Sequence, residues 1–106
     1  MINELINLIN QYEKIGEELN KVKADLRVKE LELKTRKYEL EFDSEYTKGL
    51  KVKEVAPKIH KDTLKDTEEI CELKQKRDEL ELQFKIISLK IQYTKEVIES
   101  QKINTP

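Results

Sequence analysis

The feature that most constrains the fold is a run of apolar residues whose spacing alternates between three and four. Its members are Leu5, Leu8, Tyr12, Ile15, Leu19, Val22 and Leu26. This spacing places every member on one face of an α-helix, and its repetition is typical of the a and d positions of a left-handed coiled coil. The run therefore predicts a long amphipathic helix that buries one face against another helix.

A second run with the same spacing lies in the last third of the chain. Its members are Ile70, Leu73, Arg77, Leu80, Phe84, Ile87, Ile91, Thr94 and Ile98, of which only Arg77 and Thr94 are polar. Two such runs with one interruption predict an all-α fold in which two long helices form an antiparallel coiled-coil hairpin. We expect helix one at about 2–46, a turn at about 47–57 and helix two at about 58–102, in a single domain spanning residues 1–106.

The expected turn is the segment in which the helical pattern breaks. Gly49 suits the left-handed position after a helix, and Pro57 suits the first turn of the next one. Thr63 and Asp66 offer a later capping start for helix two, and the sequence does not choose between the two starts. Residues 50–55 alternate like a strand, but a single strand without a partner is marginal, so we expect an ordered connection there.

The second half of helix one has two candidate buried faces. Continuing the first run by sevens gives Leu33 and Leu40, but Lys29 and Arg36 occupy the intervening positions. On nearly the opposite face, the same alternating spacing is followed by Ala24, Val28, Leu31, Thr35, Tyr38 and Phe42. We therefore expect helix one to change the face that it buries about halfway along.

Helix two carries an additional apolar stripe beside its main run, formed by Leu82, Ile86, Leu89 and Tyr93. A two-helix hairpin cannot bury two faces of both helices. Either this stripe or the pair Leu33 and Leu40 should therefore pack against another chain, most simply a second copy in a helical bundle. We expect Leu82, Ile86, Leu89 and Tyr93 to form the interface of a homodimer or higher homo-oligomer. The alternative is that one wide apolar face surrounds the intramolecular contact.

The composition fits a thin core, because 37% of the residues are hydrophobic and 41% are charged. Low hydropathy and high charge also occur in disordered chains, but the apolar periodicity and the net charge of -1 argue against disorder. The balance of 21 basic and 22 acidic residues opposes general attraction to nucleic acid or membranes. No apolar run approaches the ~20 residues of a membrane span, and the first residues do not resemble a signal peptide. We expect a cytoplasmic protein without a membrane partner.

No motif in the sequence indicates catalysis. A glycine-rich phosphate loop, His-Glu-x-x-His and Cys-x-x-Cys are absent, and a helical hairpin offers little concavity. We therefore expect no enzyme, no catalytic residue, no cofactor and no metal. The dense carboxylates Glu30, Glu32, Glu39, Glu41, Asp43 and Glu45 are interpreted as solvated charge. We expect His60 at the surface and Cys71 packed as a small hydrophobe beside Leu64 and Thr67.

A lysine-rich segment surrounds the expected turn and includes Lys48, Lys51, Lys53, Lys58, Lys61 and Lys65. Only Glu54 and Asp62 oppose these six lysines, which gives a local charge of +4. Such a tip could contact a protein partner or phosphates, or be a solvated loop. With no arginine and only Tyr46 as a nearby aromatic residue, any nucleic-acid binding would be non-specific and sensitive to salt.

Residues 51–70 begin with a Lys- and Val-rich stretch and contain the runs Asp62-Thr63 and Thr67-Glu68-Glu69. In this segment and in its outline, the chain resembles small Lys/Glu-rich coiled-coil proteins from the early gene clusters of phages of low-GC Gram-positive bacteria. The resemblance implies a non-enzymatic accessory or inhibitor that binds a host or phage protein complex in the bacterial cytoplasm. The alternatives are a nucleic-acid accessory protein that uses the basic tip and a holdase-like chaperone.

Overall fold

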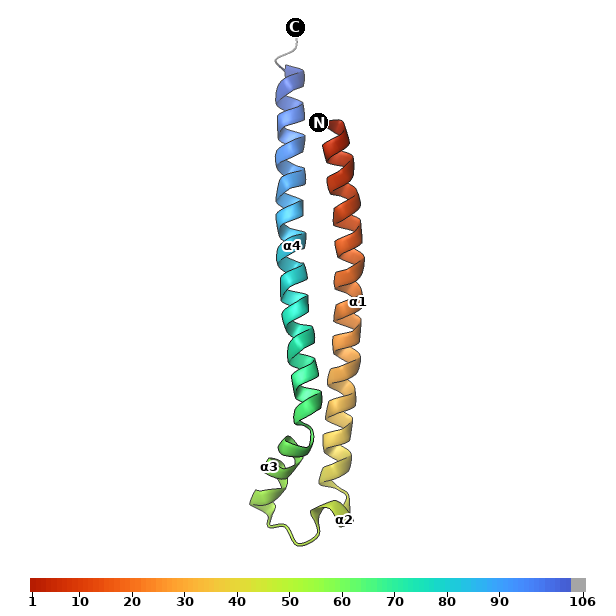
Figure 1. Ribbon diagram of the computed structural model, residues 1–106, viewed down its shortest axis with the longest axis vertical. Helices are drawn as coiled ribbons and strands as arrows, with labels where there is room; N and C mark the ends of the chain where they lie inside the picture. Colours follow the sequence, from red (N-terminus) through yellow and green to blue (C-terminus); the bar gives the residue numbers. More distant parts are fainter. Residues whose placement is uncertain (104–106) are drawn as a thin grey trace. The chain divides into compact units, whose positions relative to one another are not determined.

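The computed structural model describes residues 1–103, and the protein is helical throughout most of this part of the chain. Its helices are α1 (Ile2–Glu41), α2 (Ser44–Thr47), α3 (Val52–Asp62) and α4 (Leu64–Ile103). Figure 1 shows the long helices α1 and α4 and the short helices α2 and α3 that connect them. Residues 1–103 contain no strand, so the predicted all-α class is confirmed.

The chain divides into two compact units, to which α1 and α4 both contribute. The terminal unit combines Met1–Val22 with the described residues from Lys76 onward, and the tip unit spans Lys23–Gln75. Each unit is described separately below.

In the terminal unit, the first half of α1 lies beside the second half of α4. The rings of Tyr12 and Phe84 stack with their centroids 4.3 Å apart. Gly16 approaches the same ring, since a Cβ atom on Gly16 would lie 3.3 Å from Cε2 of Phe84. Asn3, at the start of α1, and Ile98, near the end of α4, line one shallow hollow. Rising residue numbers on α1 therefore meet falling numbers on α4, so the two helices are antiparallel in this unit.

The core of the terminal unit follows the two predicted runs, and its buried hydrophobic residues are Leu19, Val22, Leu80 and Ile87. The two polar members of the α4 run form local interactions. Thr94 is 8% exposed, and its hydroxyl donates to the carbonyl of Lys90 at 2.8 Å. Arg77 is half-buried and pairs with Asp78 at 3.0 Å. Neither polar residue therefore interrupts the packing, because each finds a partner on its own helix.

In the tip unit, three ion pairs connect α1 to α4: Lys29 with Glu69 at 3.4 Å, Arg36 with Asp66 at 2.9 Å, and Glu30 with Lys74 at 3.8 Å. Their order shows that the helices are antiparallel here too. Leu26 is buried and Leu33 and Leu40 are half-buried, so the face of α1 defined by the first run stays buried to its end.

The expected change of buried face on α1 is therefore wrong. Val28, Leu31, Tyr38 and Phe42 are between 55% and 69% exposed. The reason lies in Lys29 and Arg36, whose long apolar stems can lie along the helix pair while their charged ends reach Glu69 and Asp66. These two residues flank the line of leucines and do not break it.

Helix α1 ends at Glu41, before the expected end near residue 46, and a short capped helix follows. The carboxylate of Asp43 accepts hydrogen bonds from the backbone amides of Glu45 at 3.0 Å and Tyr46 at 3.3 Å. This is the interaction that starts α2, since it satisfies amides that have no partner in the first turn. Gly49 then adopts φ +79°, the left-handed position predicted for it.

Helix α3 covers most of residues 50–55, where an ordered connection was expected. It begins at Val52, and the Glu54 carboxylate accepts a hydrogen bond from the Lys51 amide at 3.4 Å. Pro57 lies inside this helix and not in its first turn. The two expected starts of helix two thus correspond to two different helices, α3 and α4.

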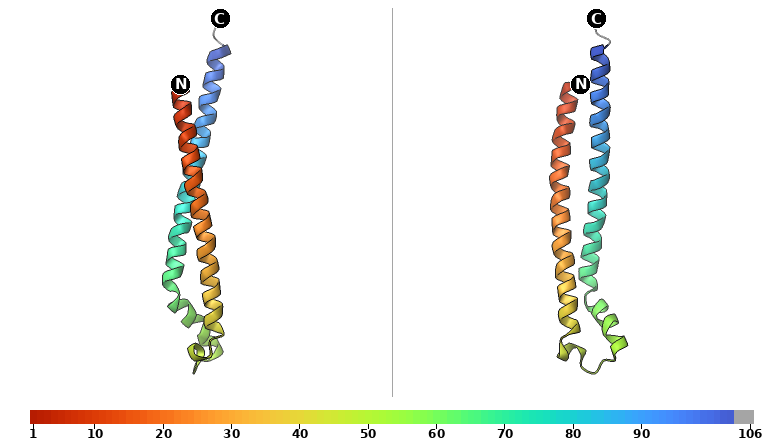
Figure 2. Two further views of the ribbon diagram at one scale, coloured as in Figure 1. Left: turned by 90° about the vertical axis from the view of Figure 1, so that its right-hand side faces the viewer. Right: turned by 180° about the vertical axis from the view of Figure 1, so that it is seen from behind.

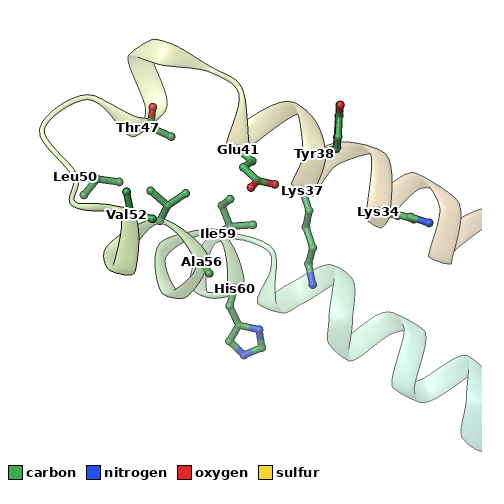
Figure 3. Close-up of a pocket in the computed structure, with 11 residues that line it drawn as sticks. Lys34, Lys37, Tyr38, Glu41, Thr47, Leu50, Val52, Ala56, Ile59 and His60 are labelled. Carbon is green, nitrogen blue, oxygen red and sulfur yellow. The ribbon is translucent and has the colours of Figure 1, made fainter.

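Thr63 joins α3 to α4 and is completely buried. Its hydroxyl donates to the carbonyl of Ile59 at 2.7 Å, while its own carbonyl accepts from the amide of Thr67 at 3.1 Å. The residue therefore closes one helix and opens the next, and the two helix axes differ in direction (Figure 2). The bend brings the apolar side of α3, with buried Ile59, back toward the end of α1 (Figure 3).

Candidate functional site

The four residues predicted as an oligomer interface lie exposed on α4 and are called the α4 stripe here. Leu82 is 60% exposed, Ile86 42%, Leu89 58% and Tyr93 69%. At about 100° per residue, the stripe lies roughly opposite the helix face that carries Leu80 and Ile87. Because α1 covers that buried face, it cannot also cover the stripe.

The tip unit has a second exposed apolar face, the α1 stripe, formed by Ala24, Val28, Leu31, Thr35, Tyr38 and Phe42. Two of its aromatic rings, Tyr38 and Phe42, are in contact, with centroids 4.7 Å apart. Sequence reasoning assigned this face to the intramolecular core and so missed it as a surface. Periodicity gave no signal that could have identified it, because both faces of this part of α1 have apolar residues at helical spacing.

The six predicted tip lysines do not form a uniform surface. Five of them, Lys48, Lys51, Lys53, Lys61 and Lys65, are exposed and form no ion pair with another residue in 1–103. Lys58 is half-buried. Its ammonium donates to the backbone carbonyl of Tyr46 at 3.1 Å and lies 4.1 Å from the centre of the Tyr46 ring. Lys58 therefore holds α2 against α3 and is not a free contact residue.

Tyr46 completes this link between α2 and α3. Its hydroxyl donates to the carboxylate of Asp62 at 2.6 Å. Partial burial, together with this hydrogen bond and the negative charge of Asp62, raises the pKa of Tyr46 to about 12. The tyrosine stays protonated and keeps donating well above neutral pH, so the arrangement is structural.

An open hollow of about 710 Å³ lies between the end of α1 and the helices that follow it (Figure 3). Its floor is apolar and includes Leu50, Val52, Val55, Ala56 and Ile59, while Lys34, Lys37, Glu41, Thr47 and His60 supply the polar groups. Tyr38 of the α1 stripe also lines it, although its ring points away from the floor (Figure 3). His60 is exposed, as predicted. The hollow contains no cysteine or serine nucleophile, and it adjoins the α1 stripe.

The remaining chemical candidates are dispersed over the described residues. Among residues 1–103, no three His, Cys, Asp or Glu side chains are grouped closely enough to hold a metal ion. Cys71 is exposed, so the prediction that it packs as a small hydrophobe is wrong. Its neighbour Ile70 takes the buried position, and Leu64, its expected contact, is 44% exposed. Cys71 therefore lies on the outer side of α4.

Comparison of the chain with family models, with curated proteins and with solved structures finds no match. The interpretation of the exposed faces therefore depends on the residues of this chain. Within residues 1–103, no helix has the length and apolar character that crossing a membrane requires.

Proposed function

We propose that the protein is a non-enzymatic coiled-coil interaction protein that assembles with a second copy of itself through the α4 stripe. The observation that carries this proposal is the exposure of Leu82, Leu89 and Tyr93, each 58% or more exposed, on a helix face that α1 leaves uncovered. Their spacing along α4 suits the knobs of a helix-helix interface.

The thin core supplies the energetic reason for assembly. Within residues 1–103, seven hydrophobic side chains are buried, which is few for a chain of this length. Removing exposed apolar area from water contributes about 25 cal/mol per Å², so covering the stripe adds burial that the single chain lacks. A second copy that binds only the folded chain also stabilises the fold by mass action.

In this proposal, the assembled helices present charged faces and the tip to a protein complex of a bacterial host or of a phage. The resemblance of residues 51–70 to small phage coiled-coil proteins supports this role and a cytoplasmic location. The protein would then act as an accessory or inhibitor by occupying a surface of that complex.

Sedimentation velocity at tens of micromolar tests the assembly. The wild-type protein should sediment as a dimer or larger, and Ile86→Glu with Leu89→Glu should lower its mass while circular dichroism shows unchanged helicity. Lys95→Glu is the matched control, because Lys95 is exposed on α4 more than about 100° around the helix from each stripe residue and the total change in charge is the same. A monomeric wild type, or a stripe variant that keeps the wild-type mass, would refute the proposed interface.

A second candidate function is non-specific binding of nucleic acid at the tip. It is favoured by the five exposed lysines without ion pairs, Lys48, Lys51, Lys53, Lys61 and Lys65. Phosphate binding by lysines releases counterions and therefore weakens steeply as salt increases. Titration with duplex and single-stranded DNA at low and high salt tests this function, and the absence of binding at low salt removes it.

A further inference from the structure

We propose that the α1 stripe is a second self-association surface, and that it pairs two copies of this chain in parallel and in register. This surface lies in the tip unit and shares no residue with the α4 stripe. The proposal therefore goes beyond the proposed function and can fail or succeed independently of it.

The spacing of the α1 stripe assigns its residues to heptad positions. Val28, Thr35 and Phe42 occupy a positions, and Ala24, Leu31 and Tyr38 occupy d positions. All six are exposed, whereas the f positions on the opposite side, Leu26, Leu33 and Leu40, are buried or half-buried. This part of α1 thus has a complete a/d face that α4 does not use.

The charges beside the stripe are sorted by sign. The e positions Asp25, Glu32 and Glu39 are all acidic, and the g positions Arg27 and Lys34 are basic, with Glu41 following at the end of α1. All of these side chains are exposed. One edge of the stripe is therefore negative, and most of the other edge is positive.

These charges also lack intramolecular ion-pair partners, unlike those on the other side of α1. Lys29, Glu30 and Arg36 pair with residues of α4. Glu32, Lys34 and Glu39 form no ion pair within the described part of the chain, and the only polar contact of Arg27 is a long one, 3.5 Å, to the carbonyl of Lys23. The charges that flank the exposed stripe thus remain available to another molecule.

The sign pattern selects both the partner and its orientation. In a parallel in-register pair, each g side chain meets the e side chain of the next heptad on the other helix. Arg27 then faces Glu32 of the second copy, and Lys34 faces Glu39 of the second copy. Two-fold symmetry repeats both contacts, which gives four attractive pairs.

The antiparallel arrangement reverses this result. There, e positions face e positions and g positions face g positions. Acids then oppose acids along the whole e edge and Lys34 opposes its own copy, so repulsive contacts outnumber the attractive ones, which are limited to Arg27 with Glu41. The α4 stripe lacks the parallel pattern, since Lys85 at g would meet Lys90 at e of the second copy. Parallel self-pairing is thus a specific property of the flanks of the α1 stripe.

Charge reversal tests the pairing, in a protein that also carries Ile86→Glu and Leu89→Glu to remove the α4 interface. One variant adds Glu32→Lys and Glu39→Lys, which makes both edges positive, and the other adds Arg27→Glu and Lys34→Glu, which makes both edges negative. Each variant alone should dimerise at least about tenfold more weakly at low salt, equivalent to about 1.4 kcal/mol. An equimolar mixture of the two should recover the dimer.

The control for net charge is Glu68→Lys with Glu72→Lys, two exposed residues on α4 in the same unit, which should leave the dimer unchanged. A background protein that stays monomeric at tens of micromolar would overturn the proposal, as would a mixture that does not recover the dimer. If the α4 stripe is not an interface, the result is different: the protein with Ile86→Glu and Leu89→Glu would then have the same mass as the wild type.

Disulfide trapping tests the orientation in the same background with Cys71→Ser. In the parallel arrangement, a protein with Ala24→Cys should cross-link with itself under mild oxidation, because the two d positions are adjacent. In the antiparallel arrangement, Ala24→Cys would instead cross-link with Phe42→Cys in a mixture. The proposal is supported if Ala24→Cys cross-links with itself faster than it cross-links with Phe42→Cys. It is overturned if the cross-link between Ala24→Cys and Phe42→Cys forms faster.

Discussion

Two leucines on the second half of α1 provide a quantitative test of which face this helix buries. Leu26 is 5% exposed and Leu31 is 66% exposed, although they lie only five positions apart on one helix. Replacing each with alanine removes the same atoms, and the helix propensities of leucine and alanine are close. The difference in unfolding free energy between the two variants therefore reports burial.

The expected cost of Leu26→Ala is about 2–3 kcal/mol. Each buried methylene contributes about 0.8 kcal/mol, so the three carbons removed account for about 2.3 kcal/mol when almost fully buried. The cavity left behind adds to this, but a core only two helices wide can partly collapse, which favours the lower part of the usual range of about 2–5 kcal/mol. For Leu31→Ala the same reasoning gives about 0.5–0.8 kcal/mol, since only a third of the side chain is covered.

Urea unfolding followed by circular dichroism measures both values, provided that the slope m is unchanged between the variants. The series should be repeated over a range of protein concentrations, because a second copy on the α1 stripe would make the cost of Leu31→Ala rise with concentration. A concentration-independent cost of Leu31→Ala equal to or above that of Leu26→Ala would refute the packing of α1 described here.

Three further outcomes are expected. Gly16→Leu should cost about 1–3 kcal/mol in thermal or urea unfolding, because a Cβ there already lies 3.3 Å from the ring of Phe84, and a smaller loss would mean that the ring moves freely. Because the pKa of Tyr46 is raised to about 12, its stabilising bond to Asp62 is complete below pH 10 and is lost between pH 10 and 12. Spectrophotometric titration should find a tyrosine that ionises near pH 12 and is missing in Tyr46→Phe, and a curve that Tyr46→Phe leaves unchanged in that range would contradict this. Cys71 should react with a thiol reagent in the folded protein as fast as in urea, and marked protection would show that it is covered.

The sequence by itself determined the all-α class, the two long runs and the exposed α4 stripe. It could do so because the runs from Leu5 to Leu26 and from Ile70 to Ile98 are longer than any other apolar run with helical spacing in their parts of the chain. The left-handed backbone of Gly49 could be predicted for a similar reason, since few other residues adopt positive φ at low cost. In these segments, the conformation that the local sequence favours is the one that the folded protein adopts.

The short-range signals near the tip were less informative. Residues 50–55 alternate like a strand, yet α3 begins at Val52, because a strand needs a partner and a helix satisfies its own backbone. Cys71 sits beside the buried Ile70, and a shift of one position on a helix turns a side chain about 100° away from the core. The existence of these helices follows from the sequence, whereas their boundaries and the faces that they bury depend on tertiary contacts.

Only the tertiary structure decided which face of the second half of α1 is buried. Both faces have helical apolar spacing, so periodicity cannot separate them. The decision comes from contacts with residues far away in sequence: Leu26, Leu33 and Leu40 are buried or half-buried, and on the same side of α1 Lys29 and Arg36 reach Glu69 and Asp66 of α4. The sequence specified two apolar faces on α1, and long-range contacts buried one of them and left the other exposed.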